Sequence, residues 1–224
     1  MKYTDIAWDF DGTLVDSYPN LTKLMQDALE SFGCKEDSEE IRKRLVVTLR
    51  HARDFFAEKY GLDSDELSQR FNSLKEAQPE VLPLFPGVEE VLREIKESGR
   101  RNHLYTNRKE DAVHYMEELG ILHYFDGLMT YEKMADYKPN PDGMFKLLAE
   151  YRVEPSKMLM VGDRILDLEA SKAAGADGCF YNTNGLPVPE CADFVVEDML
   201  FRRLACERNA HLRKRNDGNK IKTA

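Results

Sequence analysis

The sequence of 224 residues predicts an α/β protein, a doubly wound parallel sheet with a separate α-helical insert. Short apolar segments typical of buried strands alternate with amphipathic helical segments from residue 88 onward. A strand of the same kind, residues 3–10, opens the chain, whereas residues 21–78 carry helical patterns and almost no strand-like alternation. The helical block therefore interrupts the α/β pattern directly after its first strand.

Three segments of the helical block carry apolar residues at helical spacing. The first, residues 21–33, and the second, residues 38–61, each end in glycine, which is a common helix stop. The third, residues 63–78, begins with Asp and Ser, which favour the first position of a helix. We expect one helix from each segment, packed as a small bundle in an insert that spans residues 16–84.

A proline-rich segment, residues 79–88, is interpreted as a connector or hinge between the insert and the rest of the chain. Beyond it the elements alternate as a parallel sheet covered by helices on both faces requires. Helices are predicted at residues 88–99, 109–121, 141–153 and 165–175, and strands at residues 101–107, 125–132, 157–163 and 176–182. The α/β core is thus expected over residues 1–15 and 85–205, followed by a basic tail, residues 206–224.

Composition and charge limit the possible partners. A net charge of −9 argues against general nucleic-acid binding, which needs a basic face. No apolar run approaches the roughly twenty residues that span a bilayer, and no signal peptide precedes the first strand. The four cysteines show no CxxC spacing. We expect a cytoplasmic monomer or homodimer that binds a small molecule, with neither nucleic acid nor membrane as partner.

Two carboxylates stand where the first predicted strand ends. Asp9 and Asp11 follow an apolar run that we expect to be buried, where neighbouring carboxylates repel each other and lose hydration. A bound cation, a reaction that needs a nucleophile and an acid, or a plain solvated turn would each offset that cost. Gly12, the next residue, allows the backbone to approach an anion closely.

Polar residues also follow the other predicted strands, at the edge where open α/β sheets bind ligands. Asp163 would join Asp9 and Asp11 as an oxygen ligand of the kind that Mg²⁺ uses. No Ser or Cys at these strand ends has an obvious His partner, so a nucleophile here would be a carboxylate. Carboxylates can act as covalent nucleophiles by forming an aspartyl-phosphate.

Hydrogen-bond donors that suit a phosphoryl group also follow the predicted strands, beside the acids. Thr106 and Asn107 follow the strand at residues 101–107, and Lys138 follows the next strand with one positive charge. The residues together favour Mg²⁺-dependent phosphoryl transfer.

Four segments, "DFDGTLVDS", "YTN", the lysine of "YKPNPD" and "VGDRILD", resemble in order the four motifs of the haloacid dehalogenase (HAD) superfamily. The resemblance covers residues 1–200, and the helical insert resembles that superfamily's small α-helical cap. The branch that looks most similar contains phosphoglycolate phosphatases and β-phosphoglucomutases.

The resemblance implies roles for the acids. Asp9 is similar to the nucleophile that becomes phosphorylated. Asp11 is similar to the general acid/base, whose backbone carbonyl also binds Mg²⁺, and Asp163 is similar to the acidic metal ligand. Asp167 matches a second acid that either lies near the metal through water or holds the lysine.

The remaining motif residues are implied to bind phosphate. Thr106 and Asn107 match the phosphate-binding second motif, and Lys138 matches the lysine that steadies both nucleophile and phosphate. Arg164 lies where the family pattern varies and receives no catalytic role.

The expected function is a Mg²⁺-dependent phosphatase that hydrolyses a small phosphorylated metabolite. Asp11 and Asp163 argue against haloacid dehalogenase chemistry, which uses neither the second acid nor Mg²⁺. A phosphomutase of the β-phosphoglucomutase type and a non-catalytic phospho-accepting switch remain as alternatives. Arg50 and His51 in the insert are candidates for substrate selection.

Overall fold

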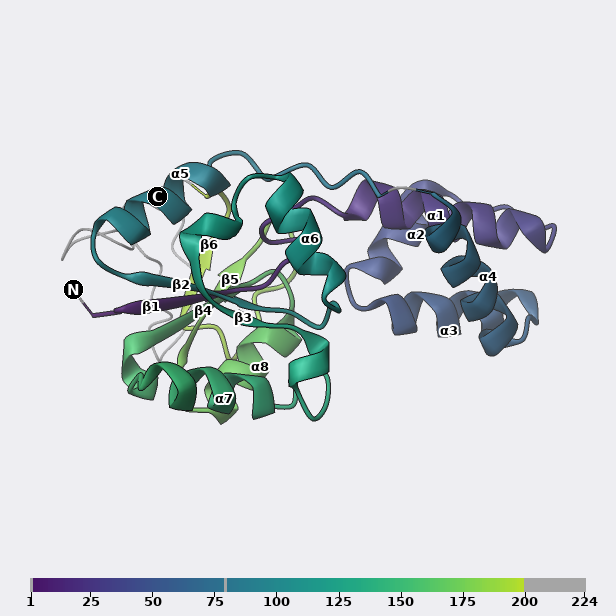
Figure 1. Cartoon of the computed structure of the whole chain (residues 1–224). Coiled ribbons are helices and arrows are strands. Elements are labelled where there is room, and N and C mark those ends of the chain that lie inside the picture. Colours follow the sequence, from purple (N-terminus) through teal and green to yellow (C-terminus); the bar gives the residue numbers. More distant parts are fainter. Residues whose placement is uncertain (1, 79, 200–224) are drawn as a thin grey trace. The chain divides into compact units, whose positions relative to one another are not determined.

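The computed structural model describes residues 2–78 and 80–199, so the predicted basic tail at residues 206–224 lies outside the described residues. The chain divides into two compact units, which are described separately (Figure 1). One is an α/β unit that runs to Val15 and resumes at Leu84, and the other is a helical unit, Asp16–Pro83.

The α/β unit contains a parallel sheet whose six strands, within the described residues, have the order β3-β2-β1-β4-β5-β6. The strands are β1 (Asp5–Trp8), β2 (Arg101–Tyr105), β3 (Phe125–Met129), β4 (Met158–Gly162), β5 (Asp177–Tyr181) and β6 (Phe194–Val196). This order confirms the predicted doubly wound sheet. The direction of strand addition reverses between β1 and β4, and ligands bind at such a switch point.

The register of the central strands determines which residues lie side by side where the strands end at the candidate site. Trp8 at the end of β1 pairs with Leu104 of β2 and with Val161 of β4. The N–H of Asp9 then bonds to the carbonyl oxygen of Val161 at 3.0 Å, so the first site residue is held directly to the neighbouring strand β4. All residues of β1 are buried, which explains the apolar run at residues 6–8.

Helices cover both faces of the sheet. They are α5 (Val88–Glu97), α6 (Asp111–Glu118), α7 (Asp142–Tyr151) and α8 (Ile165–Ala173). Figure 1 shows α5 and α6 on one face and α7 and α8 on the other. Ala7 and Met160 of the sheet belong to the same buried cluster as Met144 and Leu147 of α7 and Ala170 of α8. Burial of such side chains, at about 1.5–3 kcal/mol for each large one, fixes α7 and α8 against the sheet that carries the site.

The helical unit contains α1 (Tyr18–Ser31), α2 (Ser38–Leu45), α3 (Leu49–Tyr60) and α4 (Ser64–Ala77). The prediction of one helix over residues 38–61 is wrong, because α2 ends before Val46 and α3 begins after Thr48. β-Branched side chains lower helix propensity at this break. The Thr48 hydroxyl oxygen accepts the N–H of His51 at 2.9 Å and starts a new helix.

The two residues that flank the insertion pair within the α/β unit. Val15 and Leu84 form an antiparallel bridge, so Leu84 belongs to this unit and not to the insert. Strand β6 was missed in the sequence analysis because three residues are too few for a visible pattern. No helix among the described residues is long and apolar enough to cross a membrane.

Candidate active site

The ammonium group of Lys138 lies at the centre of the candidate site. Its Nζ is 2.7 Å from Oδ1 of Asp9 and 2.6 Å from Oδ1 of Asp167. It also donates to the carbonyl oxygen of Tyr105 at 2.8 Å. The side chain is fully buried, and these partners match the three donors of an ammonium group. Lys138 thus joins the ends of β1 and β2 to the first turn of α8.

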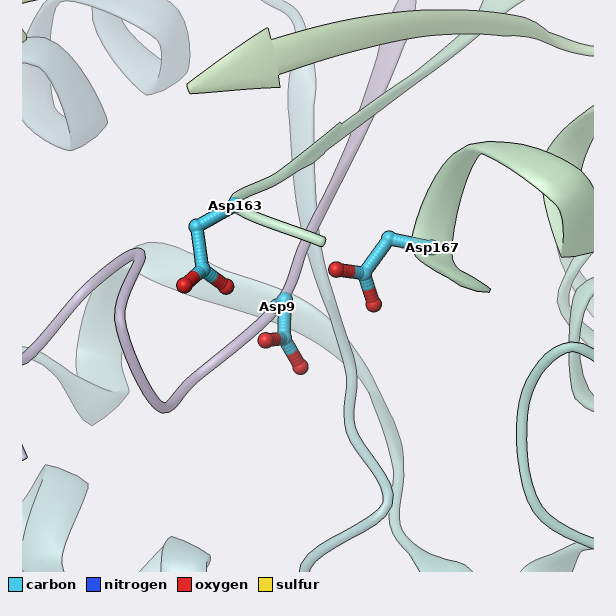
Figure 2. A group of neighbouring side chains, drawn as sticks. All are labelled: Asp9, Asp163 and Asp167. Carbon is cyan, nitrogen blue, oxygen red and sulfur yellow. The ribbon is translucent and has the colours of Figure 1, made fainter. Parts of the chain in front are cut away.

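Three buried carboxylates meet beside this lysine. Oxygens of Asp9, Asp163 and Asp167 lie within 4.8 Å of one another, and the group could hold a metal ion. Figure 2 shows the three side chains as neighbours, with Asp9 and Asp163 at the ends of β1 and β4 and Asp167 in α8. The structure therefore brings three of the predicted acids together at the switch point of the sheet.

Burial and neighbouring charges shift the pKa values of Asp9 and Lys138 in this cluster. Burial raises the pKa of Asp9 above its ordinary value, and the carboxylate of Asp167 raises it further, while Lys138 and Arg164 offset part of the rise. Burial alone would lower the pKa of Lys138, but Asp167 and Asp9 outweigh it and hold the pKa above its ordinary value. The three acids outnumber the two basic groups beside them, Lys138 and Arg164, which suits a bound cation.

Two glycines make the geometry possible. Gly12 has a φ of +79°, a left-handed conformation that glycine adopts without strain, and its N–H donates to the carbonyl oxygen of Val15 at 2.9 Å. At Gly162, a Cβ atom would lie 2.4 Å from the Cβ of Asp167. The absence of a side chain at Gly162 therefore lets Asp167 approach Lys138. Gly162 was not predicted as a site residue, although it stands directly before Asp163 at the end of a predicted strand.

Asp11 lies apart from the three-acid group. Its side chain is 27% exposed, and its Oδ1 is 3.6 Å from Nη1 of Arg108. The Arg108 guanidinium is buried over the rings of Phe10 and Tyr115 and also pairs with Asp111 at 3.0 Å. Arg108 was not singled out as a site residue in the sequence analysis. Its position directly after "TN" was the available signal.

In the segment that resembles the second motif, the side chains of Thr106 and Asn107 bond to nearby backbone groups. Thr106 is buried, and its Oγ1 accepts the N–H of Arg108 at 3.1 Å. The side-chain oxygen of Asn107 accepts the backbone N–H of Lys138 at 2.7 Å, and its nitrogen donates to the Lys138 carbonyl oxygen at 3.3 Å.

Arg164 is closer to the cluster than the sequence indicated. Its Nη2 is 3.6 Å from Oδ2 of Asp9, and its Nε is 3.8 Å from Oδ1 of Asp163. Its backbone N–H donates to Oδ2 of Asp167 at 3.1 Å, which caps α8. Arg164 thus adds a second positive charge beside the acids.

Arg50 and His51 lie in the first turn of α3 in the helical unit, and both are exposed. A depression on α3 is lined by Thr48, Arg50, His51, Asp54, Phe55 and Glu58.

Fold and site together define a doubly wound α/β protein with a buried acidic centre and one embedded lysine at its switch point. The family model described as "Haloacid dehalogenase-like hydrolase" matches residues 6–180. The chain belongs to the haloacid dehalogenase-like hydrolases, which confirms the resemblance drawn from the four motifs and the expectation of a hydrolase.

Known proteins similar to the chain agree with this assignment. Phosphoglycolate phosphatase 1 of Pseudomonas aeruginosa is 30% identical over 90% of this chain and 78% of its own length. Phosphoglycolate phosphatase of Vibrio parahaemolyticus is 30% identical over 87% of this chain and 92% of its own length. The crystal structure of a predicted phosphoglycolate phosphatase from Haemophilus somnus has a TM-score of 0.78 at 21% identity and covers 90% of this chain and 97% of that one. This structural match shows the shared fold.

Proposed function

We propose that the protein is a Mg²⁺-dependent phosphatase that hydrolyses a small phosphate monoester through a phosphorylated Asp9. The observation that carries the proposal is the asymmetry of the Asp9 carboxylate. Lys138 holds Oδ1 at 2.7 Å, whereas Oδ2 is buried and has no hydrogen-bond partner among the described residues. A buried oxygen left in this way is costly unless it serves a ligand or a reaction.

The residues fit a bound Mg²⁺ ion. Asp9 and Asp163 offer hard oxygen ligands of the kind that Mg²⁺ prefers, within a buried group of acids that could hold a metal ion. Asp9, the backbone carbonyl of Asp11 and Asp163 would hold the ion. When bound, Mg²⁺ offsets the repulsion between a carboxylate nucleophile and the phosphate oxygens.

The chain's own residues then perform two displacements. An oxygen of the Asp9 carboxylate attacks phosphorus, the ester P–O bond breaks, and Asp11 donates a proton to the leaving oxygen. Asp11 next removes a proton from a water molecule that attacks the phosphorus of phosphorylated Asp9. The acyl-phosphate bond breaks, inorganic phosphate leaves, and the Asp9 carboxylate is restored. The partial exposure of Asp11 supports its contact with water.

Phosphate would be held by the donors at the neighbouring strand ends. We assign this role to the hydroxyl of Thr106 and to backbone N–H groups next to Gly12 and Asn107. Lys138 adds its positive charge to the attraction, because its three donors already bond to protein oxygens. In addition, Lys138 favours the ionised form of Asp9 that the attack needs.

The substrate class follows from the relatives. Because two relatives named phosphoglycolate phosphatase are 30% identical to this chain, we propose a small phosphorylated metabolite of the phosphoglycolate kind. We further propose that the helical unit, Asp16–Pro83, acts as a cap in which Arg50 and His51 select the leaving group. The described cysteines, Cys34, Cys179 and Cys191, are free, which supports a cytoplasmic location.

The test measures phosphate release from phosphoglycolate, acetyl phosphate and a panel of sugar phosphates, with Mg²⁺ and then with EDTA. We expect continuous release to water with Mg²⁺ and none after rigorous metal removal. Asp9→Asn should be inactive on every substrate. A single turnover without release would favour a phospho-accepting switch, and conversion of a sugar phosphate to its isomer would favour a mutase. Activity that survives metal removal would exclude the proposal.

A further inference from the structure

One side chain holds both backbone polar groups of Lys138. Oδ1 of Asn107 accepts the Lys138 N–H at 2.7 Å, and Nδ2 donates to the Lys138 carbonyl oxygen at 3.3 Å. The two residues are 31 positions apart in sequence. Asn107 therefore ties the loop after β2 to the backbone from which the central lysine projects.

The position of Lys138 must be accurate because its ammonium group serves three partners at once. Its Nζ lies 2.6–2.8 Å from oxygens of Asp9, Asp167 and Tyr105. A backbone shift would lengthen these contacts together and leave two buried carboxylates without their shared cation.

Other contacts hold the preceding loop without reaching the Lys138 backbone. The rings of Tyr131 and Tyr137 stack with centroids 4.0 Å apart and an interplanar angle of 8°. The N–H of Ala135 bonds to a carboxylate oxygen of Asp142 at 2.7 Å. These contacts shape the loop, and the bonds from Asn107 fix the point where Lys138 leaves it.

We infer that the side chain of Asn107 is a positioning residue that acts through Lys138, instead of a ligand of the phosphate. The inference deepens the proposed function and rests on it. Asparagine suits this task because one planar amide carries both an acceptor and a donor, which match the N–H and carbonyl groups of a single residue.

The chain offers a matched control in Asn182, directly after β5. Its Oδ1 accepts the N–H of Leu186 at 2.8 Å, and its Nδ2 donates to the Leu186 carbonyl oxygen at 2.9 Å. Asn182→Ala therefore removes the same pair of bonds from a loop that holds none of the proposed catalytic residues.

The experiment compares Asn107→Ala, Asn182→Ala, Lys138→Met and the double variant Asn107→Ala with Lys138→Met, using acetyl phosphate and Mg²⁺. We expect Asn107→Ala to lower kcat on the order of 10- to 100-fold, as a misplaced catalytic group does. KM and inhibition by inorganic phosphate should change by less than about threefold, because no contact with phosphate is lost. In the Lys138→Met background, Asn107→Ala should cost less than about twofold, and Asn182→Ala should remain active.

A crystal structure of Asn107→Ala gives a second measurement, with Lys138 Nζ displaced from Asp9 as the expected result. If the Ala variant does not fold, Asn107→Asp replaces it, because a carboxylate keeps the acceptor for the Lys138 N–H and loses the donor. A higher KM with unchanged kcat, an equal loss in both backgrounds, or an unmoved Lys138 would overturn the inference. Absence of phosphate release by the wild-type protein would defeat the proposed function, while the crystal structure would still decide the position of Lys138.

Discussion

At the scale of single residues, the carboxylate that we propose as the nucleophile, Asp9, is also one whose ionisation destabilises the folded protein. Its pKa is raised by burial and by Asp167, so the folded protein without metal favours the protonated acid more than the unfolded chain does. The associated stability is present below the ordinary pKa of 3.8 and is lost as pH rises through the raised value. A functional carboxylate of this kind lowers stability where it is ionised.

We therefore expect Asp9→Asn to unfold at a higher temperature than the wild type in EDTA at neutral pH. The gain should be on the order of 3 kcal/mol, because the pKa of Asp9 is raised from 3.8 to about 6 and one pKa unit corresponds to about 1.4 kcal/mol. Thermal unfolding should be followed over an interval of roughly pH 4 to pH 8, the width that such a titration needs. Over this interval the stability of the wild type relative to that of the Asp9→Asn variant should fall as pH rises. If the stability of the two proteins changed with pH in the same way, ionisation of Asp9 would not destabilise the folded protein.

Gly162 gives a second prediction at this scale. In Gly162→Ala the new Cβ would lie 2.4 Å from the Cβ of Asp167, so Asp167 must move away from Lys138. We expect phosphatase activity to fall more than about tenfold and stability to fall by about 1–3 kcal/mol. Gly127→Ala is the control, because its Cβ would crowd His103 Nδ1 at 2.5 Å, among residues with no proposed catalytic role. Similar activity losses in both variants would assign the effect to crowding in general.

At the scale of elements, the break between α2 and α3 depends on one cap. The hydroxyl of Thr48 accepts the N–H of His51 at 2.9 Å, and Thr48→Ala removes this bond. We expect a loss of about 1 kcal/mol in the free energy of unfolding. Denaturant unfolding followed by circular dichroism would measure it, with the exposed Ser73→Ala of α4 as a control. An unchanged free energy of unfolding in Thr48→Ala would contradict the capping role.

The elements also show what the sequence can predict. The strands β1 and β4 were visible because both faces are buried, which makes the apolar run continuous. The helix break at Val46–Thr48 was hidden because the apolar spacing continues across it. Strand β6 is an edge strand of three residues and offers no period to detect.

The candidate site also contains features that the sequence predicts and features that it does not. The acids and Lys138 were predicted from the strand ends, since parallel strands deliver their carboxyl ends to one edge. The nearness of Arg108 to Asp11, and of Arg164 to Asp9, depends on side-chain directions across different elements. The two bonds from Asn107 to Lys138 likewise join loops that no local pattern connects.

At the scale of the whole molecule, the insertion is joined to the α/β unit by two adjacent segments. The Val15–Leu84 bridge lies in one unit, and the bond from the Asp16 N–H to the Pro83 carbonyl oxygen at 2.9 Å lies in the other. Paired segments of this kind suit a hinge for the proposed cap.

If the helical unit selects substrates, Arg50→Ala should change the ranking of phosphate esters. Hydrolysis of acetyl phosphate should remain within about twofold of wild type, since a minimal substrate gives a specificity residue nothing to bind. Arg70→Ala, an exposed arginine of α4, is the matched control. The measurement is kcat/KM over a substrate panel, and an equal loss on all substrates would assign Arg50 to folding or to the reaction itself.

The proposed covalent phosphorylation of Asp9 can be tested directly. Asp11→Asn should still form the acyl phosphate from a substrate with a good leaving group, such as acetyl phosphate, but should hydrolyse it slowly because the base is lost. After acid quenching, peptide mass spectrometry should find one added phosphoryl group on the peptide that contains Asp9. The same experiment with Asp9→Asn should find none. A phosphoryl group on another residue, or turnover by Asp9→Asn at the wild-type rate, would show that Asp9 is not the nucleophile.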